Sequence, residues 1–131
     1  MQQATATVTI EAPPDRVFQF VANPEHLPRW ATGFARSVRR LEDGRWQVET
    51  PQGPVSLTVA ADAVTGVVDF WISPAPDVTV LAASRVIGFE HGTAYTFTQF
   101  KPEAMPDELF QAQTRTARAE LAGLRRLLEE G

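Results

Sequence analysis

Apolar and polar residues alternate along most of the chain, and this two-residue period predicts β-strands. Residues 4–10, ATATVTI, alternate and are rich in β-branched side chains, so they are predicted as the first strand. Six later segments share the period and predict six more strands: 36–42, 45–50, 54–61, 66–73, 78–88 and 93–101. Turn-forming residues separate these segments, and sequential strands with short links predict an antiparallel meander.

Two short helices are predicted between the first and second strands. A pair of prolines followed by Asp15 suits a helix start, because proline loses no hydrogen bond there and an acid complements the helix dipole. The apolar stripe of this helix consists of Val17, Phe18, Phe20 and Val21. The helix must end before Pro24, and Pro28 then allows about one further turn. The segment NPEHLPRW, residues 23–30, is therefore predicted as a second, kinked helical piece.

The last predicted element is a helix over residues 106–130, about 37 Å long at roughly 1.5 Å per residue. Its apolar stripe consists of Phe110, Ala117, Leu121, Leu124 and Leu128. The first half of the helix also carries Gln113 and Thr114, so this half either leaves the core or lines a cavity. We expect the three leucines to be buried, and the strand residues facing them to be Trp46, Val48, Val55 and Leu57.

This order of elements resembles the START-like helix-grip superfamily (SRPBCC), with its polyketide cyclase/dehydrase and lipid-transport families. The segment TVTIEAPPDRVFQFVANPEHLPRW resembles the family's opening, an APxxxVF-type first helix followed by a proline-broken second helix that ends in Trp. The segments VVDFW, SRVI, TFTQF and MPDELF, followed by a leucine-rich helix, are similar to one of its bacterial branches. The similarity covers essentially the whole chain, which we interpret as a single domain over residues 1–131.

The resemblance implies an α+β fold in which a curved, antiparallel, seven-stranded sheet wraps around the long C-terminal helix. An apolar cavity is expected between sheet and helix, with the two short helices closing one end. Members of this superfamily bind or transform lipids, sterols, aromatic polyketides and other hydrophobic molecules. Because their catalytic residues vary from branch to branch, the resemblance assigns no catalytic residue here.

Composition excludes several classes of protein. Of the 131 residues 44% are hydrophobic and 21% charged, which is typical of a globular domain. No apolar run approaches membrane-spanning length and the first residues do not resemble a secretion signal, so we expect a cytoplasmic protein without integral membrane association. A net charge of −4 argues against nucleic-acid binding. The cluster of Arg36, Arg39, Arg40 and Arg45 is interpreted as a solvated strand face.

No cofactor or metal is expected. Cysteine is absent, and the glycines form none of the common phosphate-binding patterns. His26 and His91 lie on distant elements, and His91 is expected in an exposed turn beside Gly92. On the one-turn helix, Leu27 and Trp30 supply the apolar spacing, which points His26 away from the buried side. We therefore expect Leu27 and Trp30 to plug the end of the cavity and His26 to have no catalytic role.

Aromatic residues supply most of the candidate ligand-binding positions. They lie on the elements that would enclose the cavity, which suits a pocket for a flat or elongated apolar ligand. The aromatic candidates are Trp30, Phe34, Trp46, Trp71, Tyr95, Phe97 and Phe110. The polar candidates are Asp69, Arg85, Gln99 and Gln113.

The orientation of Asp69 and Arg85 depends on strand register. Hydrophobicity alone favours an outward Asp69, whereas the resemblance favours an inward Trp71 and hence an inward Asp69. A three-residue turn at 90–92, with its glycine left-handed, would put Arg85 on the inner face with Tyr95, Phe97 and Gln99, within reach of Asp69. A two-residue turn would instead put Val86 in that place and Arg85 outside. An inward pair could orient a polar group on an apolar ligand.

Three functions are consistent with this sequence. The first is a protein that binds a small hydrophobic molecule, such as a lipid, an aromatic compound or a polyketide, in the cavity. The second is a cyclase- or dehydratase-like enzyme that uses polar groups in the cavity. The third is an auxiliary protein that acts through a partner surface. Titratable groups meeting in pairs inside the pocket would distinguish the enzyme from the binding protein. We expect a monomer or a homodimer.

Overall fold

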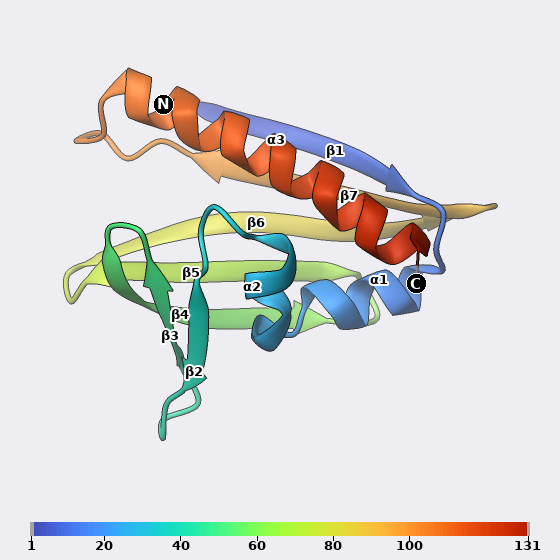
Figure 1. Cartoon of the computed structure of the whole chain (residues 1–131), viewed down its shortest axis with the longest axis horizontal. Coiled ribbons are helices and arrows are strands. Elements are labelled where there is room, and N and C mark those ends of the chain that lie inside the picture. The colour runs from blue at the N-terminus through green and yellow to red at the C-terminus, as the bar shows by residue number, and fades with distance from the viewer. Residues whose placement is uncertain (1, 131) are drawn as a thin grey trace.

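The computed structural model describes residues 2–130 and consists of one sheet with three α-helices and a short 3₁₀ helix on one side (Figure 1). The strands are β1 (Gln3–Ile10), β2 (Ser37–Arg40), β3 (Trp46–Thr50), β4 (Gly53–Asp62), β5 (Val67–Ala75), β6 (Val78–Phe89) and β7 (Gly92–Phe100). The helices are α1 (Pro14–Val21), the 3₁₀ helix η1 (Pro24–His26), α2 (Leu27–Trp30) and α3 (Asp107–Glu130). Every element therefore matches a predicted segment, with ends displaced by one or two residues.

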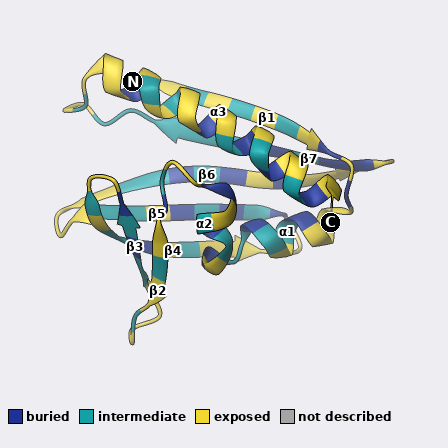
Figure 2. Cartoon of the chain, viewed as in Figure 1, coloured by how far each residue is buried: buried dark blue, intermediate teal, exposed yellow. Residues whose placement is uncertain are grey.

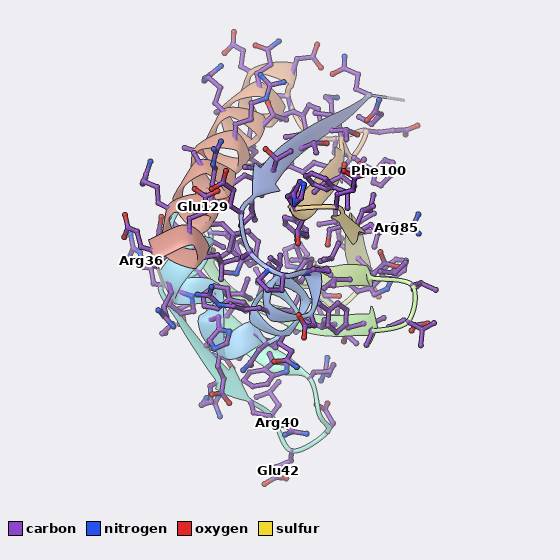
Figure 3. All side chains as sticks on the ribbon, turned by 90° about the vertical axis from the view of Figure 1, so that its right-hand side faces the viewer. Arg36, Arg40, Glu42, Arg85, Phe100 and Glu129 are labelled. Atoms are coloured by element: carbon purple, nitrogen blue, oxygen red, sulfur yellow. The ribbon has the colours of Figure 1, made fainter. Side chains whose placement is uncertain are left out.

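The sheet is antiparallel, with the strand order β1-β7-β6-β5-β4-β3-β2. The meander from β2 to β7 follows the chain, and β1 joins it at the far side by pairing with β7, so that Gln3 lies opposite Phe100 and Ile10 opposite Thr93. In the perpendicular view the sheet forms an arc with the helices on its concave side (Figure 3). The expected helix-grip architecture is confirmed.

Proline and asparagine divide the two short helices as the sequence predicted. Pro14 occupies the first turn of α1, and the Asn23 side chain accepts a hydrogen bond from the Glu25 amide at 3.0 Å, which caps η1. Pro28 lies in the first turn of α2, which ends at Trp30. The chain therefore leaves α1 and turns directly under the C-terminal half of α3.

One stripe of α3 packs into the arc. Its residues Leu121, Leu124 and Leu128 are buried, as expected (Figure 2). Val48 and Leu57 are also buried, and Trp46 and Val55 pack partly buried against the same core. All four strand residues lie on the concave face. The helix itself lies against β1 and α2, so the short helices fill much of the space between α3 and β3–β4.

Candidate functional site

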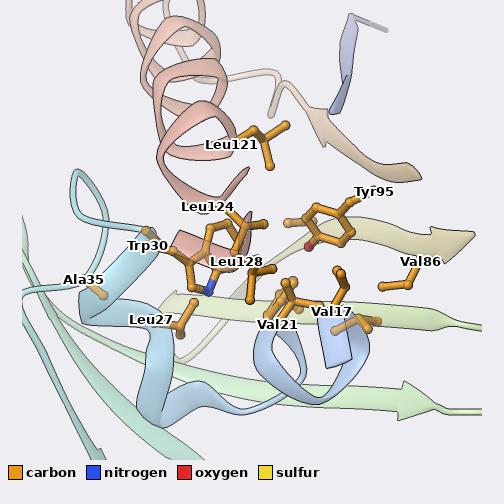
Figure 4. Packing of buried hydrophobic residues seen from close by; sticks show 14 of the residues in the cluster. Val17, Val21, Leu27, Trp30, Ala35, Val86, Tyr95, Leu121, Leu124 and Leu128 are labelled. Carbon is orange, nitrogen blue, oxygen red and sulfur yellow. The ribbon is translucent and has the colours of Figure 1, made fainter. Parts of the chain in front are cut away.

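The closed end of the arc is a packed core. Here α1, α2 and the C-terminal half of α3 meet over β6 and β7 (Figure 4). Trp30 and Leu27 are 4% and 3% exposed, so both side chains of the one-turn helix are buried, as expected. The phenol ring of Tyr95, on β7, lies edge to face with the indole of Trp30.

The other end of the concave face is less completely covered. Several large apolar side chains there are only partly buried: Phe34, Trp46, Val55, Ile72 and Phe97. Phe97 lies beside the buried Phe70, with ring centroids 6.5 Å apart. Phe110 and Ala117 on α3 are buried but do not belong to the main core cluster. We use the name apolar hollow for the set of five partly buried side chains Phe34, Trp46, Val55, Ile72 and Phe97.

Two polar atoms in the packed core are buried without a partner. Within residues 2–130, the buried side-chain nitrogen and oxygen atoms that make no hydrogen bond are Trp30 Nε1 and the Tyr95 hydroxyl. Burial raises the pKa of Tyr95, and the neighbouring Ser84 hydroxyl offsets part of that rise. Ser84 Oγ donates its own hydrogen bond to the Val68 carbonyl oxygen. The phenol is therefore neutral at physiological pH and can both donate and accept.

The loop between α2 and β2 is fastened to α3. Glu120 Oε2 accepts hydrogen bonds from the backbone amides of Gly33 and Phe34 at 3.0 and 3.2 Å. A Cβ on Gly33 would collide with Cγ2 of Thr116, so the loop lies directly on the helix. Burial raises the pKa of Glu120 to about 7, although the two amides favour its ionised form. The backbone at Phe34 is thereby held against α3.

The protein surface has two depressions among those with the best-defined linings. One, of about 340 Å³, lies between α2 and α3 and is lined by Arg29, Trp30, Glu120 and Arg126 among others. The second, of about 490 Å³, lies by the ends of β3, β4 and β5 and includes Gln47, Val55 and Pro74.

Asp69, Trp71 and Arg85 do not face the hollow. Val68 and Phe70 are buried on the concave side, so alternation places Asp69 and Trp71 on the convex side, where Trp71 is 41% exposed. Arg85 projects outward between the buried residues Ser84 and Val86 (Figure 3). The inward orientation suggested by the resemblance is therefore wrong, and these residues cannot form a polar anchor inside the cavity.

The turn between β6 and β7 explains this outcome. Phe89 pairs with Gly92, so the turn has two central residues, Glu90 and His91, and Val86 faces inward opposite Tyr95. Gly92 is not left-handed; a Cβ there would lie 2.6 Å from the Ile10 carbonyl oxygen. The glycine is thus needed for close approach to β1 rather than for the turn. His91 is exposed, as expected.

The remaining candidates fall into two groups. Phe97, Gln99 and Trp46 lie on the concave face and are partly buried, whereas Gln113 on α3 is exposed to solvent.

His26 stacks on Phe20, with centroids 4.3 Å apart, and its Nδ1 lies 2.9 Å from the Phe20 carbonyl oxygen. These contacts hold the imidazole against α1. The four clustered arginines are exposed, as predicted.

Glu120 and Ser84 were missed from the sequence. Glu120 falls within a polar stretch of the helix and looks like a solvated residue, and Ser84 lies among small strand residues. A carboxylate one residue before a buried leucine on the core-facing stripe was the available signal for Glu120, since such a position borders the core.

The family model for polyketide cyclase / dehydrase and lipid transport matches residues 1–129. The chain belongs to this family. Among curated protein sequences, none matches it significantly. Family membership and the fold together support the binding of hydrophobic ligands in general, without specifying one.

Solved structures with the same fold have low sequence identity. The XoxI protein from Bacillus cereus matches with a TM-score of 0.78 and 20% identity, over 98% of this chain and 96% of that one. Ara h 8.0201 matches with a TM-score of 0.72 and 18% identity, over 99% of both chains. The di-domain ARO/CYC protein BexL, from the BE-7585A biosynthetic pathway, matches with a TM-score of 0.75 and 17% identity, over 96% of this chain and 46% of that one. At these identities the similarity establishes the helix-grip fold alone.

The helices within residues 2–130 can be compared with membrane-spanning helices. None of its helices combines the length and the apolar character needed to cross a bilayer.

Proposed function

We propose that this family member binds a small, largely apolar molecule that carries one hydrogen-bonding oxygen. The apolar part would occupy the hollow floored by Phe34, Trp46 and Phe97, which are the partly buried aromatic side chains of the concave face. The oxygen would face Trp30 Nε1 and the Tyr95 hydroxyl. Candidate ligands are aromatic, polyketide-like or lipid molecules with a carbonyl or hydroxyl group.

The pair of unpartnered polar atoms carries this proposal. A buried donor without a partner costs roughly 1–3 kcal/mol, so a ligand oxygen that supplied the partner would recover that cost. Tyr95 stands two residues from Phe97 on the same face of β7, so an oxygen at one end of a ligand in the hollow could approach it. Trp30 has an N–H that can only donate, so the matching ligand atom is an acceptor.

A binding role is favoured over acid–base catalysis by the residues of the concave face. Over the seven strands, the inward positions carry one charged residue, Arg40, which lies at the exposed edge opposite Trp46. Acid–base work requires titratable groups that meet at the substrate, and paired groups of this kind are missing from these strand positions. The cyclase- or dehydratase-like alternative would depend on Glu120, whose carboxylate already accepts two backbone hydrogen bonds.

Two probes that differ at one position can test the proposal. Calorimetric titration should compare 2-acetylnaphthalene with 2-ethylnaphthalene, because they have similar shape but only the first offers a carbonyl oxygen. We expect both to bind, with the ketone bound about three- to ten-fold more tightly, as one net hydrogen bond provides. The preference for the ketone should fall in Tyr95→Phe and in Trp30→Phe.

Matched aromatic variants provide the control. Trp71→Phe changes an aromatic residue on the convex face and should leave both affinities unchanged. Absence of saturable binding by either probe would contradict a hydrophobic site in the hollow. Equal affinities for the two probes in the wild-type protein would refute the role of the unpartnered atoms.

A further inference from the structure

The convex face is poor in charge over four of the seven strands. Over β1, β5, β6 and β7, the outward positions of the strands carry two charged side chains, Asp69 and Arg85. The others are mostly threonine, alanine and large apolar residues. Such a surface differs from the usual solvent-facing side of an antiparallel sheet, which is polar and charged.

An apolar row crosses this face. Trp71 pairs with Leu81, and Leu81 is followed on the neighbouring strand by Phe100, because Ala82 pairs with Gln99. Trp71 is 41% exposed, and Leu81 and Phe100 are partly exposed. Figure 3 shows Phe100 and Arg85 projecting from the same outer side, away from α3.

Threonine rows lie next to the apolar row. On β1 and β7, the Thr5 and Thr98 hydroxyls lie 2.8 Å apart, and the Thr7 hydroxyl donates to that of Thr96 at 3.1 Å. In each pair one hydroxyl donates to the other, so part of the hydrogen-bonding capacity of these rows is met within the sheet. This lowers the desolvation cost of covering the rows with apolar side chains.

Neither charge on this face takes part in an ion pair with another of the described residues, 2–130. Asp69 pairs with Ala83 and Arg85 with Val67, so the two residues are diagonal neighbours on adjacent strands. Between residues 2 and 130 the ion pairs are Arg45–Asp43, Lys101–Asp107 and Arg125–Glu129, and neither Asp69 nor Arg85 takes part. Arg85 Nε instead donates to the Thr65 carbonyl oxygen at 3.1 Å, which leaves the rest of its guanidinium available.

We propose that this convex face binds a second copy of the same chain in a two-fold symmetric dimer. In an isologous interface every contact occurs twice, so one acid and one base on the same patch can form two identical ion pairs between the copies. Asp69 of each protomer lies against Arg85 of its partner. A protein of different sequence would need a matching charge pair, whereas a second copy supplies it by symmetry.

Strand spacing then fixes what the apolar row contacts. In this dimer the two-fold axis lies between the two packed sheets and passes midway between Asp69 and Arg85. Rotation about it places the end of the face that carries Trp71 over the opposite end of the partner's face. When the four strands are projected onto a plane, with strands about 4.8 Å apart and residues about 3.4 Å apart, the row of Trp71, Leu81 and Phe100 falls on the threonine rows of the partner. Charges and apolar groups are therefore satisfied by one arrangement.

The size of the face sets the expected strength. Four strands of about seven residues each cover roughly 19 Å by 24 Å, an area of about 450 Å². This is smaller than the roughly 800 Å² per partner that a standard stable interface buries. The dimer is therefore weak and concentration-dependent. It leaves the concave side open, so it does not depend on the ligand proposal above.

The dimer can be tested by sedimentation velocity at low salt, at protein concentrations from about 5 to 500 µM. Over this range the fraction of dimer formed through a small interface should change measurably. We expect a monomer–dimer equilibrium that weakens as salt is added. Asp69→Arg and Arg85→Asp should each raise the dimer Kd by at least about ten-fold, because each creates two like-charge contacts. The double variant Asp69→Arg/Arg85→Asp should restore the wild-type Kd.

Control and contrary results are distinct. Asp77→Arg, in the turn after β5, and Arg115→Asp, on the exposed side of α3, make the same charge changes away from the face and should not alter the Kd. Trp71→Thr should weaken the dimer without altering charge. A wild-type protein that is monomeric throughout the range would overturn the proposal, as would a double variant that associates no better than the single ones.

Discussion

The indole of Trp30 meets the phenol ring of Tyr95 edge to face, with ring centroids 6.2 Å apart and planes at 84°. This contact joins α2 to β7 across the closed end of the arc. Trp30→Ala should lower the free energy of unfolding by roughly 3–5 kcal/mol, as truncation of a buried aromatic does. Urea unfolding measures the effect, with Trp71→Ala as the control on the exposed face. An unchanged urea midpoint for Trp30→Ala would contradict the plug.

The contact between Gly33 and Thr116 can be tested by whether Gly33→Ala lowers or raises the free energy of unfolding. Gly33→Ala should destabilise the protein by about 1–3 kcal/mol, because the new methyl group overlaps Thr116 Cγ2. Thr116→Ala in the same chain should remove the overlap. The double variant should then equal or exceed wild-type stability, since alanine reduces the entropy of the unfolded chain by about 0.4–1 kcal/mol relative to glycine. If Gly33→Ala alone is stabilising, the loop does not lie against the helix.

Stability should depend on pH through Glu120. Burial raises the pKa of this carboxyl from its ordinary value of 4.5 to about 7, so between these values the folded state binds more protons than the unfolded state. The contribution of Glu120 is therefore complete below about pH 4.5 and is lost as pH rises through 7. Glu120→Gln keeps an acceptor for the two amides and should flatten this decline. Urea unfolding from pH 5 to 8 tests it, and identical profiles for both proteins would exclude the effect.

The buried hydroxyl of Thr93 provides a fourth test. Its Oγ1 donates to the Ala12 carbonyl oxygen at 2.7 Å, and both residues are buried. Thr93→Val preserves the shape but leaves that carbonyl unsatisfied, so the free energy of unfolding should fall by about 1–3 kcal/mol. Thr96→Val, which removes a hydroxyl from the outer face, should change it by less than about 0.5 kcal/mol. Equal effects of the two variants would indicate that the Thr93 bond contributes nothing specific.

The elements of this fold were predictable because their periods are strong and their ends are marked. The alternation of Val55, Leu57 and Val59 indicates a strand with one buried face. The three- and four-residue spacing of the leucines in α3 indicates a helix with one buried stripe. The prolines around Asn23 mark the break between the short helices just as clearly. Residues that are buried by their own element's pattern, such as Leu27 and Trp30, were therefore identified correctly.

Orientation of the charged strand residues was harder, because it depended on a single residue in one turn. Moving the β6–β7 register by one residue exchanges the two faces of a strand. The glycine at position 92 is equally compatible with a left-handed turn residue and with close approach to another strand, and only the folded chain brings Ile10 beside it. The register that forms places Arg85 outside.

The partners in contacts between distant segments could not be read from local sequence. The hydrogen bonds from Gly33 and Phe34 to Glu120 join residues 87 and 86 positions apart, so no spacing rule reaches them. The orphaned atoms of Trp30 and Tyr95 belong to the same class. Each residue looks like ordinary aromatic core in the sequence, and only the packed arrangement shows that their polar atoms lack partners.

The pairing of β1 with β7 has a consequence for how the chain folds. Gln3 lies opposite Phe100, so the first strand cannot find its partner until 97 further residues exist. At a synthesis rate of roughly 5–20 residues per second, β1 waits about 5–20 s while the meander forms without it. During that interval β1 keeps an open edge, which is a template for pairing with another chain. Helix α3, which packs on β1, can dock fully only once that edge has been capped.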